Sequence, residues 1–208
     1  MPFSRFEQVN EEKKTIILET ALDAFIENSF KAASINKISK NAGLSAGALY
    51  YYFQDKEDLF YTTLDYAQRE LWNLFGEIEN LFETYGYWEG ITELVMKRFE
   101  VSISHPRYMR LFQRVLLSKD AVELEGRNKL MEGFSDIFEY GYDNGHIRTD
   151  LPKAFLFNIH FNMTITINQW LLLDHENISS ENLDLETLKQ LSVKAVNMIK
   201  SAMTDEEA

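Results

Sequence analysis

The chain has 208 residues, of which 45% are hydrophobic, and this is enough to bury the core of one large domain or two small ones. It has no cysteine, which excludes a disulfide framework and a thiolate metal site. The formal net charge of −12 excludes a uniformly basic surface of the kind that binds a polyanion. The N-terminus lacks the apolar run and small-residue cleavage site of a signal peptide, so we expect a cytoplasmic protein.

The first predicted helix follows Asn10, which can cap a helix through its side chain. Glu11 and Glu12 then occupy the first turn, where acidic side chains interact favourably with the helix dipole. Apolar residues recur at helical spacing as far as Phe25, and the run ends at Asn28. This pattern predicts a helix that packs one face against the segments after it.

Two shorter predicted helices follow, separated by a glycine. Ile35, Ile38 and Ala42 share one face of the first, Gly43 interrupts the run, and Ser45 can cap the second. Two short helices around such a turn are typical of a helix-turn-helix, whose second helix can lie in a DNA major groove. By periodicity alone, the same residues could equally form the core of a small helical domain.

The order of residues in this region favours the first alternative. The segment AGLSAGALYYYF at residues 42–53, followed by DKEDL at residues 55–59, resembles the signature of the TetR family of bacterial transcriptional regulators. The strong resemblance covers about the first 60 residues, although Ser29 stands where the family usually has Gly and Ser39 where it usually has Ala. It implies a three-helix DNA-binding head attached to a larger helical body that binds a ligand and dimerises.

The resemblance also indicates residues that contact DNA. It implies phosphate contacts from Tyr50, Tyr52 and Lys56. Tyr51 is the largest side chain free to reach a base edge, because the second helix has no Arg, Lys, Asn or Gln before Gln54. The alternative interpretation of the tyrosines is ordinary aromatic packing. The expected DNA-binding residues are Ser34, Asn36, Lys37, Ser45, Ala46, Gly47, Ala48, Tyr50, Tyr51, Tyr52 and Lys56, with Lys40 as a further candidate.

The acidic charge lies mainly outside this head. Residues 1–60 contain seven Lys or Arg and nine Asp or Glu, so most of the acidic excess follows residue 60. Because even the head is not basic, its affinity for DNA must come from a few well-placed phosphate contacts. We therefore expect DNA binding with a modest dependence on salt.

The remaining residues predict a helical body. Pro106 stops one helix, because the residue before a proline is disfavoured in the α region. Beyond it, Arg107, Arg110 and Arg114 share one face. They form a solvated face or pair with the acidic body, or else they form an anion site or contact the head. The expected body helices cover about residues 56–81, 88–105, 107–117, 122–142, 154–173 and 185–203.

The predicted fold class is therefore all-α, with about nine helices. We expect a three-helix, helix-turn-helix DNA-binding domain at residues 1–55 and a ligand-binding and dimerisation domain at residues 56–208. Residues 154–173 carry no charge and are long enough to span a membrane, but their many polar side chains favour a helix buried on all sides within protein. This helix and the last one are the expected dimer surface.

The aromatic content of 13% suggests a pocket in the body, since aromatic side chains with a few polar groups line ligand cavities. The alternative is that these aromatic residues only fill the core. We expect the helix that starts at Lys56 to transmit ligand binding to the head. The expected pocket residues are Tyr66, Trp88, Phe112, Phe134, Phe138, His160, Asn162, Thr166 and Trp170.

The sequence thus predicts a ligand-responsive transcriptional regulator, a repressor that binds a palindromic operator as a homodimer and is released by a small, mainly apolar effector. The expected partners are double-stranded DNA, this effector and a second copy, with no membrane, cofactor or metal. The alternative is a helical-bundle carrier or enzyme without DNA binding. Against an enzyme, the four histidines lack metal-ligand spacing, and no phosphate loop or nucleophile elbow occurs.

Overall fold

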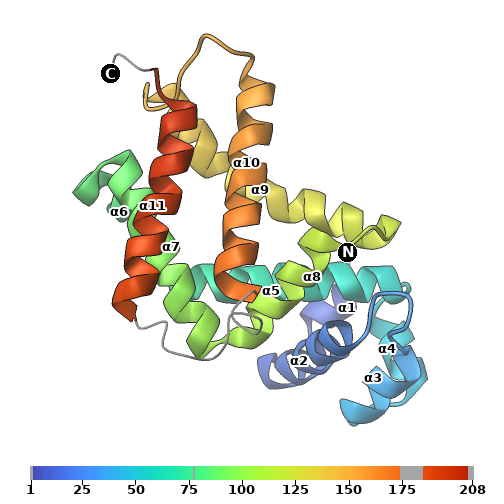
Figure 1. Cartoon of the computed structure of the whole chain (residues 1–208). Helices are drawn as coiled ribbons and strands as arrows, with labels where there is room; N and C mark the ends of the chain where they lie inside the picture. Colours follow the sequence, from blue (N-terminus) through green and yellow to red (C-terminus); the bar gives the residue numbers. More distant parts are fainter. Residues whose placement is uncertain (1, 77, 174–184, 206–208) are drawn as a thin grey trace. The chain divides into compact units, whose positions relative to one another are not determined.

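The computed structural model describes residues 2–76, 78–173 and 185–205. Within these ranges it contains eleven helices and no strand, which confirms the all-α fold class (Figure 1). The chain divides into two compact units: unit 1 comprises Met1–Leu74 with His105–Leu130, and unit 2 comprises Phe75–Ser104 with Met131–Ala208. The chain therefore leaves unit 1 after its first 74 residues and returns to it later.

Unit 1 begins with the expected head. The predicted caps are present, since Asn10 accepts a 2.9 Å hydrogen bond from the backbone of Lys13, and Ser45 accepts one of 3.2 Å from Ala48. A short helix that the sequence pattern did not predict precedes them and buries Phe6. The helices of the head are α1 (Ser4–Glu7), α2 (Glu11–Glu27), α3 (Ile35–Asn41) and α4 (Ala46–Tyr52).

The turn between α3 and α4 is built around Gly43. Its φ of +69° lies in the left-handed region, which side chains other than glycine rarely adopt. The turn is closed by a 2.8 Å hydrogen bond from the backbone N–H of Leu44 to the carbonyl of Ser39. Ile38 and Leu49 are buried on either side of this turn, so α3 and α4 pack together as the sequence predicted.

The core of unit 1 extends beyond the head. Phe25 and Phe30 pack edge-on against Phe60 of α5 (Lys56–Phe75), with ring centroids 5.0 and 5.4 Å away. Leu111, from α8 (Pro106–Leu117), and Leu130, from α9 (Ala121–Asp143), belong to the same buried cluster. This compact unit runs past the expected boundary at residue 55, and the division into a DNA-binding and a ligand-binding domain stays a prediction.

The long helix expected over residues 56–81 is interrupted. α5 ends at Phe75, and Gly76 has a φ of +72°, which is incompatible with a continuing α-helix. A separate helix, α6, covers Ile78–Tyr85. The regular apolar spacing on both sides of Gly76 concealed this break, which adds a second unpredicted helix to the nine expected.

Unit 2 packs α6 and the second part of α9 with three further helices: α7 (Tyr87–Ser104), α10 (Lys153–Leu173) and α11 (Leu185–Met203). Its core holds Trp88, Phe138, Leu156 and Ile199. α7 ends before Pro106, as expected, and the proline becomes the first residue of α8.

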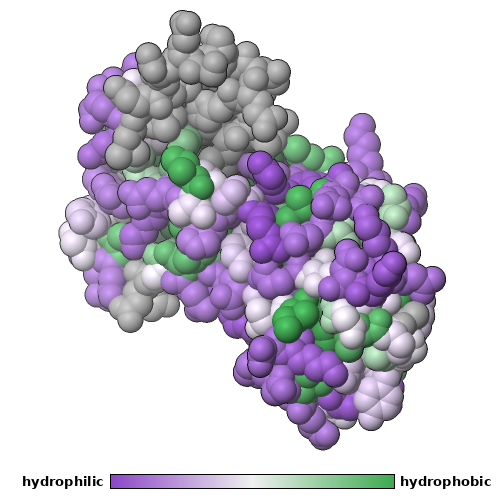
Figure 2. Space-filling view, turned by 90° about the horizontal axis from the view of Figure 1, so that it is seen from below, coloured by the Kyte–Doolittle hydropathy of each residue, from purple (hydrophilic) through white to green (hydrophobic). Residues whose placement is uncertain are grey.

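The expectation that α10 is buried on all sides is wrong for the single chain. Phe155, Asn158, Asn162 and Thr166 recur at helical spacing and are exposed. One face of α10 is therefore open to solvent and has no charge on these four residues. The part of the surface visible in Figure 2 is mainly hydrophilic, with hydrophobic residues in small, separate patches.

Candidate functional site

Helix α4 presents its aromatic side chains to solvent. Tyr50 and Tyr51 are 54% and 55% exposed, whereas Leu49 and Phe53 of the same segment are almost fully buried. The latter two attach α4 to the core and leave the tyrosines outside it, so core packing does not explain Tyr50 or Tyr51. Tyr52 is half-buried and packs against other aromatic rings.

The other predicted DNA-binding residues lie around the start of α3 and α4. Asn36, Lys37 and Gly47 are exposed, and Ala48 is half-buried. The Ser34 and Ser45 hydroxyls are exposed and each caps its helix by accepting a backbone hydrogen bond. Such a hydroxyl still has its own proton to donate to a phosphate. The side chain of Ala46 lies outside the part of the chain that the structure describes.

The N-terminal segment adds cations that the sequence analysis did not select. The backbone N–H of Phe3 donates a 2.9 Å hydrogen bond to the carbonyl of Tyr52, which holds this segment against the end of α4. The Arg5 side chain donates to the carbonyl of Tyr51, and its guanidinium lies 4.3 Å from the centroid of that ring. Lys13 of α2 donates a 3.4 Å hydrogen bond to the hydroxyl of Tyr52. The tyrosines of α4 are therefore flanked by two positive charges within an acidic chain.

Lys56 bonds within the protein. Its ammonium donates hydrogen bonds of 3.1 and 3.2 Å to the carbonyls of Lys31 and Ala33, and it lies 4.7 Å from the centre of the Phe30 ring. These contacts anchor the first turn of α5 to the loop before α3. An ammonium has three donors, so one of them can still reach a phosphate.

Among the three arginines of α8, Arg107 connects this helix to the head. Its guanidinium forms ion pairs with Glu19 at 2.5 Å and with Asp23 at 2.6 Å, both on α2. Of the alternatives left by the sequence, contact with the head is therefore correct for Arg107, since both of its acidic partners belong to the head and not to the body. Arg110 is exposed.

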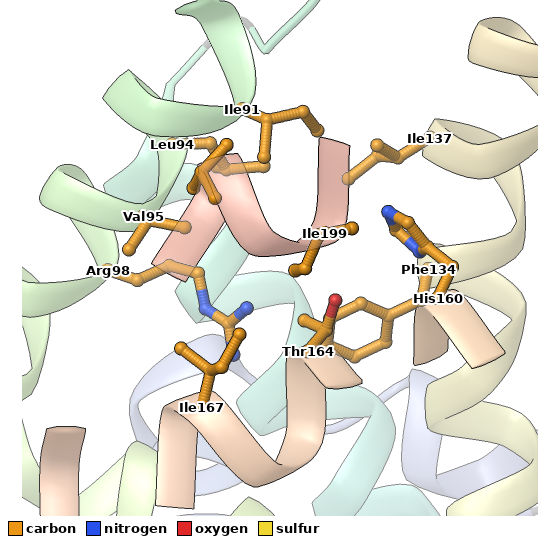
Figure 3. A pocket seen from close by; sticks show the side chains of 11 residues that line it. Ile91, Leu94, Val95, Arg98, Phe134, Ile137, His160, Thr164, Ile167 and Ile199 are labelled. Carbon is orange, nitrogen blue, oxygen red and sulfur yellow. The ribbon is translucent and has the colours of Figure 1, made fainter. Parts of the chain in front are cut away.

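Unit 2 contains a cavity between α7, α9, α10 and α11 (Figure 3). Eight of its eleven lining residues are aliphatic or aromatic, and the three polar ones are Arg98, His160 and Thr164. The space that the centre of a water molecule can reach is about 40 Å³. Since one buried water needs roughly 10–15 Å³ by this measure, the cavity has room for a few water-sized groups.

Arg98 is the charged residue among those that line this cavity. Its half-buried side chain extends from α7 towards Phe134 and Thr164 (Figure 3), and the guanidinium lies 5.3 Å from the Phe134 ring centroid. Desolvation lowers the pKa of Arg98 to about 10, so the group remains cationic at neutral pH. The sequence signal for it was a lone arginine in line with Ile91, Leu94 and Val95, at helical spacing on one face of α7.

His160 enters the same cavity from α10. It is 7% exposed, and its Nε2 atom has no hydrogen-bond partner among the described residues. Burial lowers the pKa of His160 to about 4, so the imidazole is neutral at pH 7. Its ring packs against the ring of Phe138, with 5.7 Å between the two centroids.

The predicted pocket residues fall into four groups, with Trp170 apart from them. Phe134 and His160 line the cavity, whereas Trp88 and Phe138 lie in the surrounding core of unit 2. Asn162 and Thr166 point to solvent, because the helical repeat brings His160, Thr164 and Ile167 onto the inner face of α10 instead. Tyr66 and Phe112 pack in unit 1. The side chain of Trp170 lies outside the described part of the chain.

No residue of α5 lines this cavity. The transmission of ligand binding through α5 stays a prediction. Within the described ranges, no group of three or more His, Asp or Glu side chains is placed to hold a metal ion. In the same ranges, every helix is too short or too polar to cross a bilayer.

An exposed helix after a glycine turn, with cations beside its tyrosines, defines a DNA-binding protein of the helix-turn-helix class. Comparisons with known proteins agree. Residues 17–61 match the family model described as bacterial regulatory proteins, tetR family. The DNA-binding head of the chain is therefore that of the TetR family of bacterial regulatory proteins.

Two similar proteins and one solved structure match most of the length of the chain. The fatty acid metabolism regulator protein of Bacillus subtilis is 23% identical over 168 residues, which cover 77% of this chain and 84% of that protein. The transcriptional repressor KstR2 of Mycolicibacterium smegmatis is 28% identical over 166 residues, covering 74% and 77%. The crystal structure of FadR from Bacillus subtilis in complex with stearoyl-CoA has a TM-score of 0.65 at 19% identity, covering 91% of this chain and 99% of that one.

Proposed function

We propose that the protein is a cytoplasmic repressor that binds a near-palindromic operator as a homodimer and leaves it when a small, mainly apolar ligand binds unit 2. The observation that carries the proposal is the exposed face of α4. Tyr51 would contact base edges, and the hydroxyls of Tyr50 and Tyr52 would contact phosphates together with Lys56. Arg5 would supply a further phosphate contact, because its guanidinium retains donors beyond the one used on the Tyr51 carbonyl.

The dimer surface in this proposal is formed by α10 and α11. Met198 and Val193 of α11 are 63% and 37% exposed, and Phe155 of α10 is 51% exposed. The exposed stripe of α10 that includes Asn158 and Asn162 is uncharged, so a second copy could cover it without burying an unpaired charge. Two copies related by a two-fold axis would present two α4 helices to successive major grooves, roughly 34 Å apart or a multiple of it.

The ligand response in this proposal starts at the cavity of unit 2. A ligand larger than a few water-sized groups fits only when the helices around the cavity move apart, so it binds the widened state preferentially. α7 supplies Arg98 to the cavity and is joined to α8 through His105 alone. At the start of α8, Arg107 pairs with α2 of the head. A shift of α7 would therefore act on the head through a short covalent link and an ion pair.

The similar proteins support these finer points. KstR2 is a repressor by name, and the FadR crystal structure contains stearoyl-CoA, a ligand with a long apolar chain. The regulator of Bacillus subtilis acts in fatty acid metabolism by name. An apolar effector for this chain is consistent with the eight apolar residues that line its cavity.

A mobility-shift assay on DNA from beside the protein's own gene tests the proposal. We expect a dimer to shift one fragment that contains a near-palindrome, and selected lipophilic compounds both to raise the thermal stability of the protein and to release the DNA. A protein that binds such compounds but no DNA would instead be a helical carrier. DNA binding that no lipophilic compound changes would remove the ligand response from the proposal.

A further inference from the structure

The cavity of unit 2 contains a cation without an anionic partner. Among the described residues, no carboxylate pairs with Arg98, and its contact is with the Phe134 ring. Desolvation alone lowers the pKa of Arg98, with no opposing contribution from a neighbouring acid. Arg98 is half-buried, and partial desolvation of a charge is costly unless an anionic partner compensates it.

Two structural explanations for Arg98 are insufficient. The contact with Phe134 is a cation–π interaction, which offsets only part of the cost of desolvating a guanidinium. A long arginine side chain can also bury its stem and keep its charge in water. Arg98 instead is half-buried and extends its guanidinium into the mainly aliphatic cavity, towards Phe134 and Thr164 (Figure 3).

His160 provides a second, independent observation. Its side chain is more than nine-tenths buried, it lines the same cavity, and its Nε2 is unpartnered among the described residues. Buried polar atoms are nearly always hydrogen-bonded, so an unpartnered one beside a cavity is available to a water molecule or to a polar atom of a ligand. Because the imidazole is neutral at pH 7, it can donate a hydrogen bond without adding a second positive charge.

We propose that this cavity binds the carboxylate of an apolar acid, with the carboxylate oxygens on Arg98 and His160 and the hydrocarbon along the aliphatic walls. The planar guanidinium fork matches a carboxylate and pairs with it through two parallel hydrogen bonds. This inference rests on the ligand response proposed above and names the chemical class of the effector. A thioester of the same acid has no carboxylate to pair with Arg98.

Binding of three matched probes to the full-length protein tests this inference by calorimetry: decanoate, decan-1-ol and decanoyl-CoA. Each is used below the concentration at which it aggregates. We expect decanoate to bind at least roughly tenfold more tightly than decan-1-ol, the effect of one charge-assisted hydrogen-bonded pair. Arg98→Met should abolish this advantage and leave binding of the alcohol unchanged. Arg110→Met, which removes the same charge from an exposed position of α8, should retain it.

The stability of the unliganded Arg98→Met variant is the second measurement. Loss of an unpaired, desolvated cation should leave its melting temperature equal to or above that of the wild type. A lower melting temperature would assign Arg98 a structural role and overturn the inference. Equal binding of acid and alcohol, tighter binding of decanoyl-CoA, or no binding of any probe would also overturn it.

These outcomes are separable from those that test the proposed function, because none of the measurements involves DNA. Decanoate that binds through Arg98 without changing DNA affinity would refute the ligand response and leave the carboxylate site intact. Conversely, release of DNA by decan-1-ol as effectively as by decanoate, in both the wild type and Arg98→Met, would retain the ligand response and refute the carboxylate site.

Discussion

Arg107 and Glu19 join α8 to α2 through an ion pair of 2.5 Å between Nη1 and Oε2. The other oxygen of the same carboxylate accepts hydrogen bonds of 2.7 Å from Tyr66 and 3.0 Å from Tyr108. One side chain of the head therefore collects contacts from both α5 and α8. If α8 shifts when a ligand enters unit 2, the contacts of Glu19 would pass this shift on to α2.

Arg107→Met should separate ligand binding from DNA release. The pair is partly exposed, so we expect its loss to lower the free energy of unfolding by no more than about 1 kcal/mol. Ligand affinity should stay unchanged, while the factor by which ligand weakens DNA binding should shrink. Titrations of DNA with and without ligand measure this factor, and Arg110→Met is the matched control. An unchanged factor would show that coupling takes another route.

Tyr51→Ala and Arg5→Met should have opposite signatures in DNA binding. Loss of Tyr51 removes a base contact, so the preference for the operator over random DNA should fall by about tenfold. Loss of Arg5 removes a phosphate contact, so affinity for all sequences should fall and the salt slope should decrease by about 1. Affinities measured at several salt concentrations on both kinds of DNA distinguish them. If Tyr51→Ala weakened binding to all sequences and Arg5→Met changed the sequence preference, the two assignments would be wrong.

Lys56→Ala should weaken DNA binding and also destabilise unit 1. The substitution removes the hydrogen bonds to the carbonyls of Lys31 and Ala33, which we expect to cost about 1–2 kcal/mol of unfolding free energy. Affinity should fall equally for operator and random DNA. Thermal unfolding and DNA titration check the two effects, with the exposed Lys119→Ala as control. Altered sequence preference at unchanged affinity would contradict the phosphate role.

Met198→Asp should break the dimer. Met198 is 63% exposed in the single chain, so the substitution should leave the monomer folded but place an unpaired charge in the proposed interface. Light scattering should show monomers, and operator binding should be lost with them. Ile103→Asp, at a residue of α7 that is 69% exposed, should leave the dimer intact. A Met198→Asp protein that remains dimeric would locate the interface elsewhere.

His160→Gln should reduce the loss of unfolding free energy that the protein shows as the pH falls below 6.5. Burial lowers the pKa of His160 from 6.5 to about 4, so below pH 6.5 the unfolded chain binds a proton that the folded chain does not. Stability from this group is therefore lost as the pH falls from 6.5 towards 4, and the loss reaches roughly 3 kcal/mol at pH 4. Denaturant unfolding at several pH values should show the difference between the variant and the wild type shrinking or reversing by this amount. A constant difference across the range would contradict it.

The head was predictable from the sequence because its signals are local. Asn10 and Ser45 cap their helices through residues three positions away, and Gly43 sets the turn by its own conformation. The exposure of Tyr50 and Tyr51 followed from the helical repeat. The contribution of Arg5 was missed because it depends on a contact with Tyr51, 46 positions along the chain.

The cavity was less predictable for the same reason. A list of aromatic residues does not indicate which helix faces meet: two of the expected pocket residues, Tyr66 and Phe112, pack in unit 1 and do not line this cavity. On α10, the choice between the Asn162 face and the Thr164 face depends on the neighbours of the helix. Arg98 carried a usable signal, a charge within an apolar stripe, but only the structure shows that it lacks an anionic partner among the described residues.

Glu123, at the start of α9, limits where the chain can be cut to obtain a DNA-binding head that folds alone. Its carboxylate is 3% exposed and accepts a 3.0 Å hydrogen bond from the backbone of Phe30, while its other oxygen accepts from the hydroxyl of Ser118. A fragment that ends at residue 55 would leave the Phe30 N–H without this acceptor and would expose the faces that pack on Phe60 and Leu111. The head should therefore unfold cooperatively with α5, α8 and the first turns of α9. A chimera with another effector domain would have to exchange all of these segments together.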